Sequence, residues 1–119
     1  MIDAFEFLAE TIAAQGGSED LVRRATIVLD EVCSNMIRHD DSLTDASLFT
    51  VEVVLDGAAV TMVISDRGRA FDPLAHSQDS SPENGGHGIA LIKGLASAVA
   101  YRRVKSCNRL TVTVTPGDD

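Results

Sequence analysis

The sequence predicts an α+β fold with two layers, a mainly antiparallel sheet of about four strands covered on one face by three helices. The first observation behind this prediction is helical spacing of apolar residues in two stretches near the start and in a third after a polar loop. The second is a set of four runs rich in Val, Ile and Thr, which pair into two hairpins. Because helices and hairpins are segregated along the chain, we expect one sheet with its helices on one side.

The first two helices are predicted from residues 2–14 and from Ser18 to about residue 39. Apolar residues recur at spacings of three and four in both stretches. Gly16 and Gly17 are expected to end the first helix, and Ser18 to cap the second. The apolar stripe of the second helix consists of Leu21, Ala25, Val28, Val32 and Met36.

The predicted strands follow these helices. Residues 48–55 and 58–65 form one hairpin, because Asp56-Gly57 between two such runs is a strong turn signal. A third helix is predicted over 88–97. A second hairpin is predicted from 98–104 and 109–115, with its turn at 105–108, and the tail 116–119 is expected to fray.

Length and composition indicate a single domain over residues 1–119. No apolar run is long enough to span a membrane, and the first ten residues lack a signal-peptide pattern. Two cysteines favour a reducing cytoplasm over a disulfide framework. The formal net charge of −8 disfavours binding to nucleic acid. A local basic group, Arg102, Arg103, Lys105 and Arg109, is either a solvated strand and turn, which we slightly favour, or a patch for an acidic partner.

Three polar residues follow one line along the second helix. Glu31 and Asn35 are four residues apart, and His39 continues the line at the edge of the apolar stripe. A partly desolvated carboxylate suits a general base, and an amide oxygen one turn along suits Mg²⁺. From the spacing alone, an exposed Glu–Asn pair, which is common on any helix, is the favoured interpretation.

The segment 66–96 combines a carboxylate, a polar loop and a glycine cluster. Asp66 and Gly68 come directly after an apolar run, and Gly85-Gly86-His87-Gly88 opens the third predicted helix. Glycines that lead into a helix start present backbone N–H groups and the positive end of the helix dipole, which suits phosphates. Such a cluster is also common in ordinary loops.

Together these segments resemble the ATP-binding domain of the GHKL superfamily, which includes gyrases, chaperones, histidine kinases and MutL-type repair proteins. The similarity is closest to the bacterial anti-sigma-factor serine kinases. LDEVCSNMIRH at 29–39 looks like the N-box, ISDRGRAFDP at 64–73 like the first glycine box, and NGGHGIALIKGLA at 84–96 like the second. The resemblance covers about residues 5–115 and implies the Bergerat-type fold.

The resemblance implies a role for each matching residue. Glu31 would be the catalytic base, and Asn35 would hold Mg²⁺ against the phosphates of ATP, in the same box as His39. Asp66 would accept a hydrogen bond from the adenine amino group, and Gly68 would let the backbone approach the ring. Thr111 would support Asp66 and adenine. The further nucleotide contacts in the two glycine boxes would be Phe71, Gly86, His87, Gly88 and Ile89.

The serine kinases phosphorylate a small anti-anti-sigma (STAS-type) protein and also bind a sigma factor, so the resemblance implies partners of this kind. Residues 72–85 would form the ATP lid, although an ungated surface loop is an equal alternative. Ala70 departs from the family pattern, where a second glycine is usual. A strand usually precedes the first helix in these kinases, so its absence here leaves homodimer formation open. A non-catalytic, partner-sequestering module and an orphan domain that passes phosphate to histidine are the alternative functions.

Overall fold

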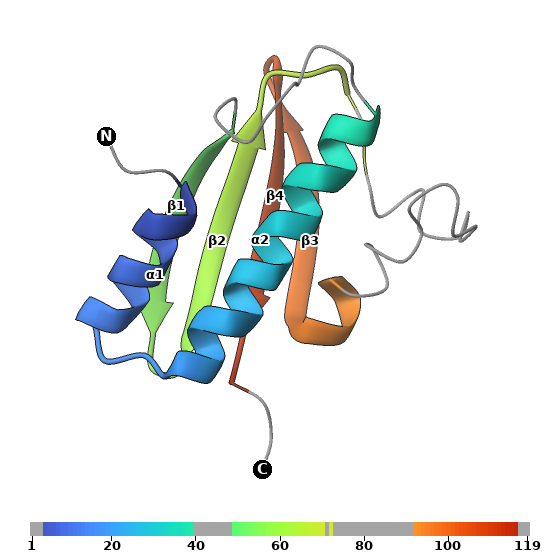
Figure 1. Ribbon diagram of the computed structural model, residues 1–119. Coiled ribbons are helices and arrows are strands. Elements are labelled where there is room, and N and C mark those ends of the chain that lie inside the picture. Colours follow the sequence, from blue (N-terminus) through green and yellow to red (C-terminus); the bar gives the residue numbers. More distant parts are fainter. Residues whose placement is uncertain (1–3, 40–48, 71, 73–91, 117–119) are drawn as a thin grey trace.

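The computed structural model describes residues 4–39, 49–70, 72 and 92–116. In order along the chain these form α1 (Ala4–Ala14), α2 (Glu19–His39), β1 (Thr50–Asp56), β2 (Ala59–Asp66), β3 (Ala96–Val104) and β4 (Cys107–Val114). The strands make one antiparallel sheet in the order β1-β2-β4-β3 (Figure 1). The predicted fold class is confirmed.

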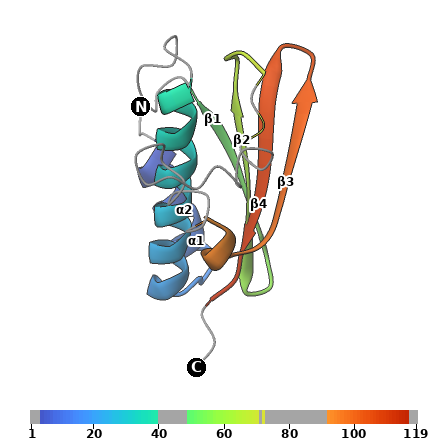
Figure 2. The ribbon, with the colours of Figure 1, turned by 90° about the vertical axis from the view of Figure 1, so that its right-hand side faces the viewer.

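The two long helices lie side by side on one face of this sheet (Figure 2). α1 packs against β1 and α2, whereas α2 crosses β2 and β4. The core between the layers contains the apolar stripe predicted for α2, together with alternate residues of β2 and β4 such as Met62 and Val112. In β2 this alternation leaves Val60, Met62, Ile64 and Asp66 buried. Asp66 is therefore directed to the helical side of the sheet.

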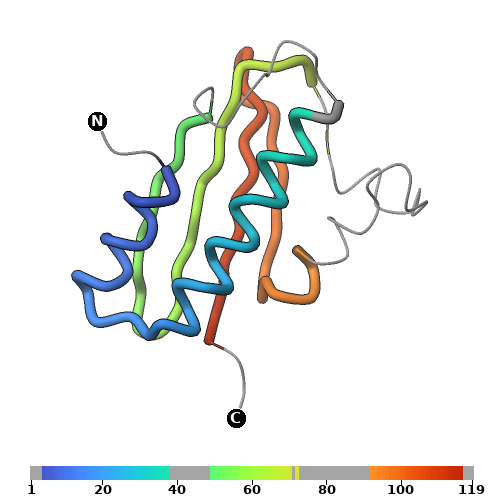
Figure 3. The backbone as a smooth tube through the Cα atoms, viewed as in Figure 1, coloured from blue at the N-terminus to red at the C-terminus, as the bar shows by residue number. Residues whose placement is uncertain are grey.

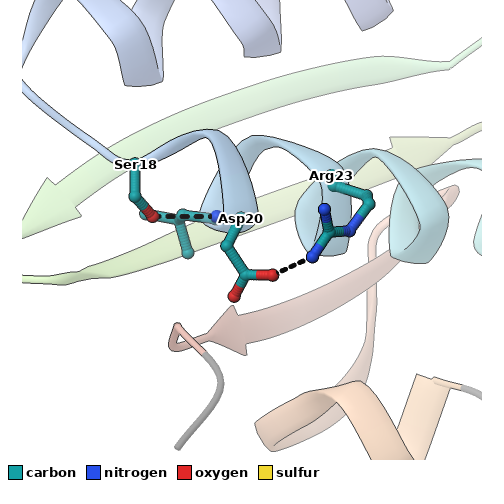
Figure 4. Close-up of polar contacts among 4 residues, drawn as sticks. Ser18, Asp20 and Arg23 are labelled. Atoms are coloured by element: carbon teal, nitrogen blue, oxygen red, sulfur yellow. Dashed lines mark hydrogen bonds and ion pairs between the residues drawn. The ribbon is translucent and has the colours of Figure 1, made fainter. Parts of the chain in front are cut away.

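The connection between α1 and α2 is built from local hydrogen bonds. Gly17 N donates to Ile12 O at 2.8 Å and Gly16 N to Ala13 O at 3.1 Å, with Gly16 at a φ of 83°. This pattern of bonds satisfies the last carbonyls of α1. Ser18 Oγ then accepts from the backbone N–H of Leu21 at 3.0 Å, and Asp20 pairs with Arg23 in the first turns of α2 (Figure 4). The predicted helix end and cap are confirmed.

Both hairpins form. The first turn is shifted by one residue from its predicted position, and the second turn is shorter than predicted. Asp56 pairs with Ala59, so the first turn is Gly57-Ala58, with Gly57 at a φ of 63°. A glycine at the first central position with positive φ is typical of a type II′ turn. In the second hairpin Val104 pairs with Cys107, so the turn is only Lys105-Ser106, with Lys105 at a φ of 56°. Cys107 and Asn108, which were predicted to be turn residues, therefore lie in β4.

The third helix is described only over 92–95, where the chain makes a helical turn before β3 begins at Ala96 (Figure 3). The helix was predicted to end at about residue 97, two residues later than it does. Ala96 pairs with Val114 and Ala98 with Thr113, so a β-bulge at this point lets β3 begin early. Ile92 in this turn is buried in the core.

The close approach of Gly17 to α1 gives a stability prediction. A β-carbon at Gly17 would lie 2.3 Å from Ile12 Cγ2 and 3.0 Å from Ile12 O, whereas one at Gly94 would have no atom within 4 Å. We expect Gly17→Ala to lower the free energy of unfolding by about 1–3 kcal/mol through overpacking. Gly94→Ala should leave stability unchanged or raise it slightly. Urea denaturation of both variants tests this, and equal midpoints would contradict the Schellman-type packing at Gly17.

Candidate functional site

A buried carboxylate lies at the end of β2, beneath α2. Asp66 is 4% exposed, and its Oδ1 accepts hydrogen bonds from the backbone N–H of Gly68 at 2.8 Å and from Asn108 Nδ2 at 2.9 Å. Asp66 lies opposite Asn108 in the β2–β4 register, which places both side chains on the same face of the sheet. The two bonds fix the position of the carboxylate and both engage the same oxygen.

The amide of Asn108 connects this carboxylate to β3 and to the loop after β2. Its Nδ2 also donates to Arg69 O at 2.8 Å, and its Oδ1 accepts from Tyr101 Oη at 2.6 Å and from Arg103 Nη1 at 3.1 Å. These bonds account for both N–H donors and both lone pairs of the side chain, which is 2% exposed. Arg103 Nη1 further donates to Gly68 O at 2.8 Å. The network therefore holds residues 66–69 against the β3–β4 hairpin.

A small cavity adjoins the network, between α2 and the sheet. Its wall is mostly apolar and its volume is about 10 Å³, which is room for one water molecule. The polar groups that reach it come from the network described above. Its lining residues are Val32, Met36, Ile64, Asp66, Tyr101, Asn108 and Leu110. A fixed carboxylate in the wall of an apolar cavity suits the part of a ligand that carries a hydrogen-bond donor.

The polar line predicted along α2 lies beside this cavity. Val32 and Met36 line the cavity, and Glu31 and Asn35 immediately precede them on the helix. Glu31 is partly exposed, whereas Asn35 is 3% exposed. Asn35 is thus a buried polar residue on the same helix as the cavity residues Val32 and Met36, which keeps it a candidate for contact with a ligand. His39 is the last residue of α2, and its side chain lies outside the described part.

Thr111 does not lie beside Asp66, contrary to the role given to it from the sequence. It pairs with Val63, and its neighbours Leu110 and Val112 are buried on the helical side. Successive side chains alternate along a strand, so Thr111 is on the opposite face of the sheet. That face also carries the hydroxyl pair Thr61–Thr113 at 3.1 Å. Asn108 takes the supporting position instead. The polar run 105–108 predicts a turn, so no strand pattern in the sequence points to Asn108.

The phosphate-binding part of the predicted site lies outside the described residues. This applies to Phe71, Gly86, His87, Gly88 and Ile89, and to the lid apart from Asp72. Across the described ranges, no group of three or more His, Cys, Asp and Glu side chains could hold a metal ion by itself. A cation at Asn35 would therefore need other ligands, such as phosphate oxygens and water.

The ionisation of Cys33, a buried residue of α2, depends on its burial and on nearby charges. Burial raises the pKa of its thiol to about 12, with further contributions from the charges of Asp30 and Asp66. The thiol is consequently protonated at neutral pH, and it behaves as an apolar core residue rather than as a nucleophile. The contribution of Asp66 also agrees with its position beneath α2.

Comparison with known proteins identifies the class of this fold and site. The family model of the histidine kinase-like ATPase domain matches residues 2–114, so the chain belongs to this family of ATP-binding GHKL domains. The fold is shared with the histidine kinase AdeS of Acinetobacter baumannii, with a TM-score of 0.56 and 18% identity. That match covers 82% of this chain and 48% of AdeS, so the chain spans about half the length of the kinase.

Among individual proteins, the chain is similar to the serine/threonine-protein kinase BtrW of Bordetella bronchiseptica. The two are 28% identical over 118 residues, which cover 93% of this chain and 82% of BtrW.

In addition, no helix in the described ranges is both long and apolar enough to cross a membrane.

The network around Asp66 gives a prediction about stability. Asn108→Ala removes a buried donor from Asp66 and an acceptor from Tyr101, so we expect a loss of about 1–3 kcal/mol in the free energy of unfolding. Thr111→Ala, three residues along the same strand on the opposite face, should change it by less than about 1 kcal/mol. Chemical denaturation of the two variants provides the measurement. A larger loss in Thr111→Ala would contradict the assignment of Asn108 as the support of Asp66.

Proposed function

We propose that this chain is a Mg-ATP-dependent serine kinase that phosphorylates a small anti-anti-sigma (STAS-type) protein and also binds a sigma factor or similar regulator. The observation that carries the proposal is the buried carboxylate of Asp66, held by Gly68 and Asn108 at the edge of an apolar cavity. Similarity to BtrW, a serine/threonine-protein kinase, supports the choice of phospho-acceptor.

Adenine recognition follows from the geometry of the Asp66 carboxylate. Oδ1 already accepts from Gly68 and Asn108, so Oδ2 is the oxygen that would accept from the amino group of adenine. Guanine presents a carbonyl oxygen at the corresponding position, which a carboxylate repels. The cavity is smaller than a purine, so Met36 or Tyr101 in its wall would move on binding. An unbranched methionine is suited to such a change.

The chemistry of transfer would depend on α2 and on the bound cofactor. Mg²⁺, when bound with ATP, supplies charge neutralisation for the phosphates. Asn35 would contribute an amide oxygen to the cation, and Glu31, one turn earlier, would accept the proton of the attacking serine hydroxyl. The serine oxygen would form a bond to the γ-phosphorus as the bond to the β,γ-bridging oxygen breaks and ADP leaves. The partial exposure of Glu31 lets a protein substrate reach it.

A non-catalytic module that sequesters a partner is the second candidate function. The small volume of the cavity favours it, because a cavity of about 10 Å³ suits a fold that binds nucleotide weakly. Ala70, in place of a second glycine, also agrees with it. A phosphorylated partner protein would exclude this alternative. Acid-stable phosphate on that partner would further exclude transfer to histidine.

Nucleotide selectivity tests the role of Asp66. In Asp66→Asn the amide oxygen must accept from Gly68 and Asn108, so its NH₂ group would face the amino group of adenine. We expect ATP affinity to fall roughly 10- to 150-fold, the effect of about 1.5–3 kcal/mol for a charge-assisted hydrogen bond. The preference for ATP over GTP should also shrink. Calorimetry measures both, with Asp56→Asn, the same change at an exposed carboxylate, as the control. Unchanged selectivity in Asp66→Asn would contradict the assignment.

The two residues on α2 should separate binding from transfer. We expect Asn35→Ala to abolish the Mg²⁺-dependent part of ATP binding, because the cation loses its protein ligand. Glu31→Gln should retain ATP affinity and slow phosphate transfer to a STAS-type protein about 10²- to 10⁴-fold, the usual contribution of a general base. Calorimetry with and without Mg²⁺ and a radiolabel transfer assay provide the readouts. Transfer at the wild-type rate in Glu31→Gln would remove Glu31 as the base.

A further inference from the structure

Positive charge is concentrated at one end of this acidic protein. The chain has 10 Lys and Arg residues against 18 Asp and Glu residues. More than half of the basic side chains lie in the loop after β2 and on the β3–β4 hairpin, and all of these are exposed. We call this group the basic end; it consists of Arg67, Arg69, Arg102, Arg103, Lys105 and Arg109.

Contacts between backbone and side chains hold the two segments of the basic end next to each other. Arg103 Nη1 donates to Gly68 O at 2.8 Å, and Asn108 Nδ2 donates to Arg69 O at 2.8 Å. The loop therefore lies directly against the hairpin, and the charges of both segments add to one local potential.

Two arginines of the basic end lie directly opposite each other across β3 and β4. Arg102 pairs with Arg109 in the register, and both side chains are exposed. Their neighbours Tyr101 and Leu110 line the cavity under α2, so the two arginines lie on the open face of the sheet. Like charges in directly opposite positions destabilise a sheet. Replacing one of the two arginines would therefore stabilise the sheet, so the presence of both points to a role other than folding.

The sheet does not neutralise this pair. The same row continues from Arg109 to Ser65 on β2 and then to Thr50 on β1, neither of which is a carboxylate. In the next row Glu52 lies on β1, two strands from Arg109. At a strand spacing of about 4.8 Å this is roughly 10 Å to the side, beyond the Debye length of about 8 Å at physiological salt. The structure gives no ion pair to Arg102 or Arg109 within the described residues.

We infer that the basic end is a docking surface for an acidic segment of a partner protein. Guanidinium groups match carboxylates with two parallel hydrogen bonds, and two adjacent arginines on a flat sheet face can bind neighbouring carboxylates. A long nucleic acid fits less well, because it would extend from this small surface onto a protein with a net charge of −8. The inference does not rest on the kinase reaction, because none of its evidence involves bound nucleotide.

The test uses a fluorescein-labelled peptide of about 20 glutamates as the probe, with anisotropy measured at physiological salt. Arg109→Glu should weaken binding at least tenfold. Arg23→Glu makes the same change in net charge on α2, away from the basic end, and should weaken binding less than twofold. Arg109→Glu should also raise the Tm, because it replaces a like-charge pair with an opposite-charge pair. A gain in stability together with a loss of binding is the expected result.

Three outcomes would overturn the inference. The first is no binding of the peptide to the wild type at physiological salt. The second is an equal loss of affinity in Arg109→Glu and Arg23→Glu, which would mean that only net charge matters. The third is tighter binding of a 20-base-pair DNA duplex than of the peptide, which would assign the surface to phosphate groups of nucleic acid. If Arg109→Glu still binds ATP, its nucleotide site is intact, and a loss of peptide binding in this variant concerns the basic end alone.

Discussion

The hydrogen bond between Asn108 and Asp66 is the interaction on which the described site depends. It joins the end of β2 to the start of β4 inside the structure, where an unpaired carboxylate or amide would be costly. Because the same amide binds Arg69 O and Tyr101 Oη, the loop after β2, the cavity wall and the second hairpin are held together through one side chain. The carboxylate is thereby held in a fixed position in the wall of the cavity.

The helices and hairpins were predictable because their signals are local. Ser18, Gly16 and the apolar stripe of α2 determine helix ends and faces within a few residues of themselves. The errors arose where strand pairing, and not the local sequence, determines the position of a residue. Lys105 adopts a left-handed conformation that is unusual for a residue with a β-carbon, and this permits a two-residue turn that moves Asn108 into β4. The change in register explains why Asn108, and not Thr111, supports Asp66.

The candidate site was predictable in part for the same reason. Glu31 and Asn35 share a helical face by spacing alone, and Asp66 follows an alternating strand, so both positions could be derived from periodicity. The cavity wall could not, because Tyr101 and Leu110 come from strands whose register depends on both hairpins. The exposed arginine pair likewise becomes visible only when Arg102 and Arg109 are placed opposite each other, and this favours the docking role that the sequence left as the weaker alternative.

The most direct test of the account is a crystal structure of the protein with Mg²⁺ and a non-hydrolysable ATP analogue. The account predicts that the adenine amino group lies within hydrogen-bonding distance, about 3 Å, of Asp66 Oδ2. Oδ1 should keep its bonds to Gly68 and Asn108, and Met36 or Tyr101 should have moved to enlarge the cavity. Adenine bound elsewhere, or a carboxylate turned away from Asn108 to reach it, would contradict the central claim.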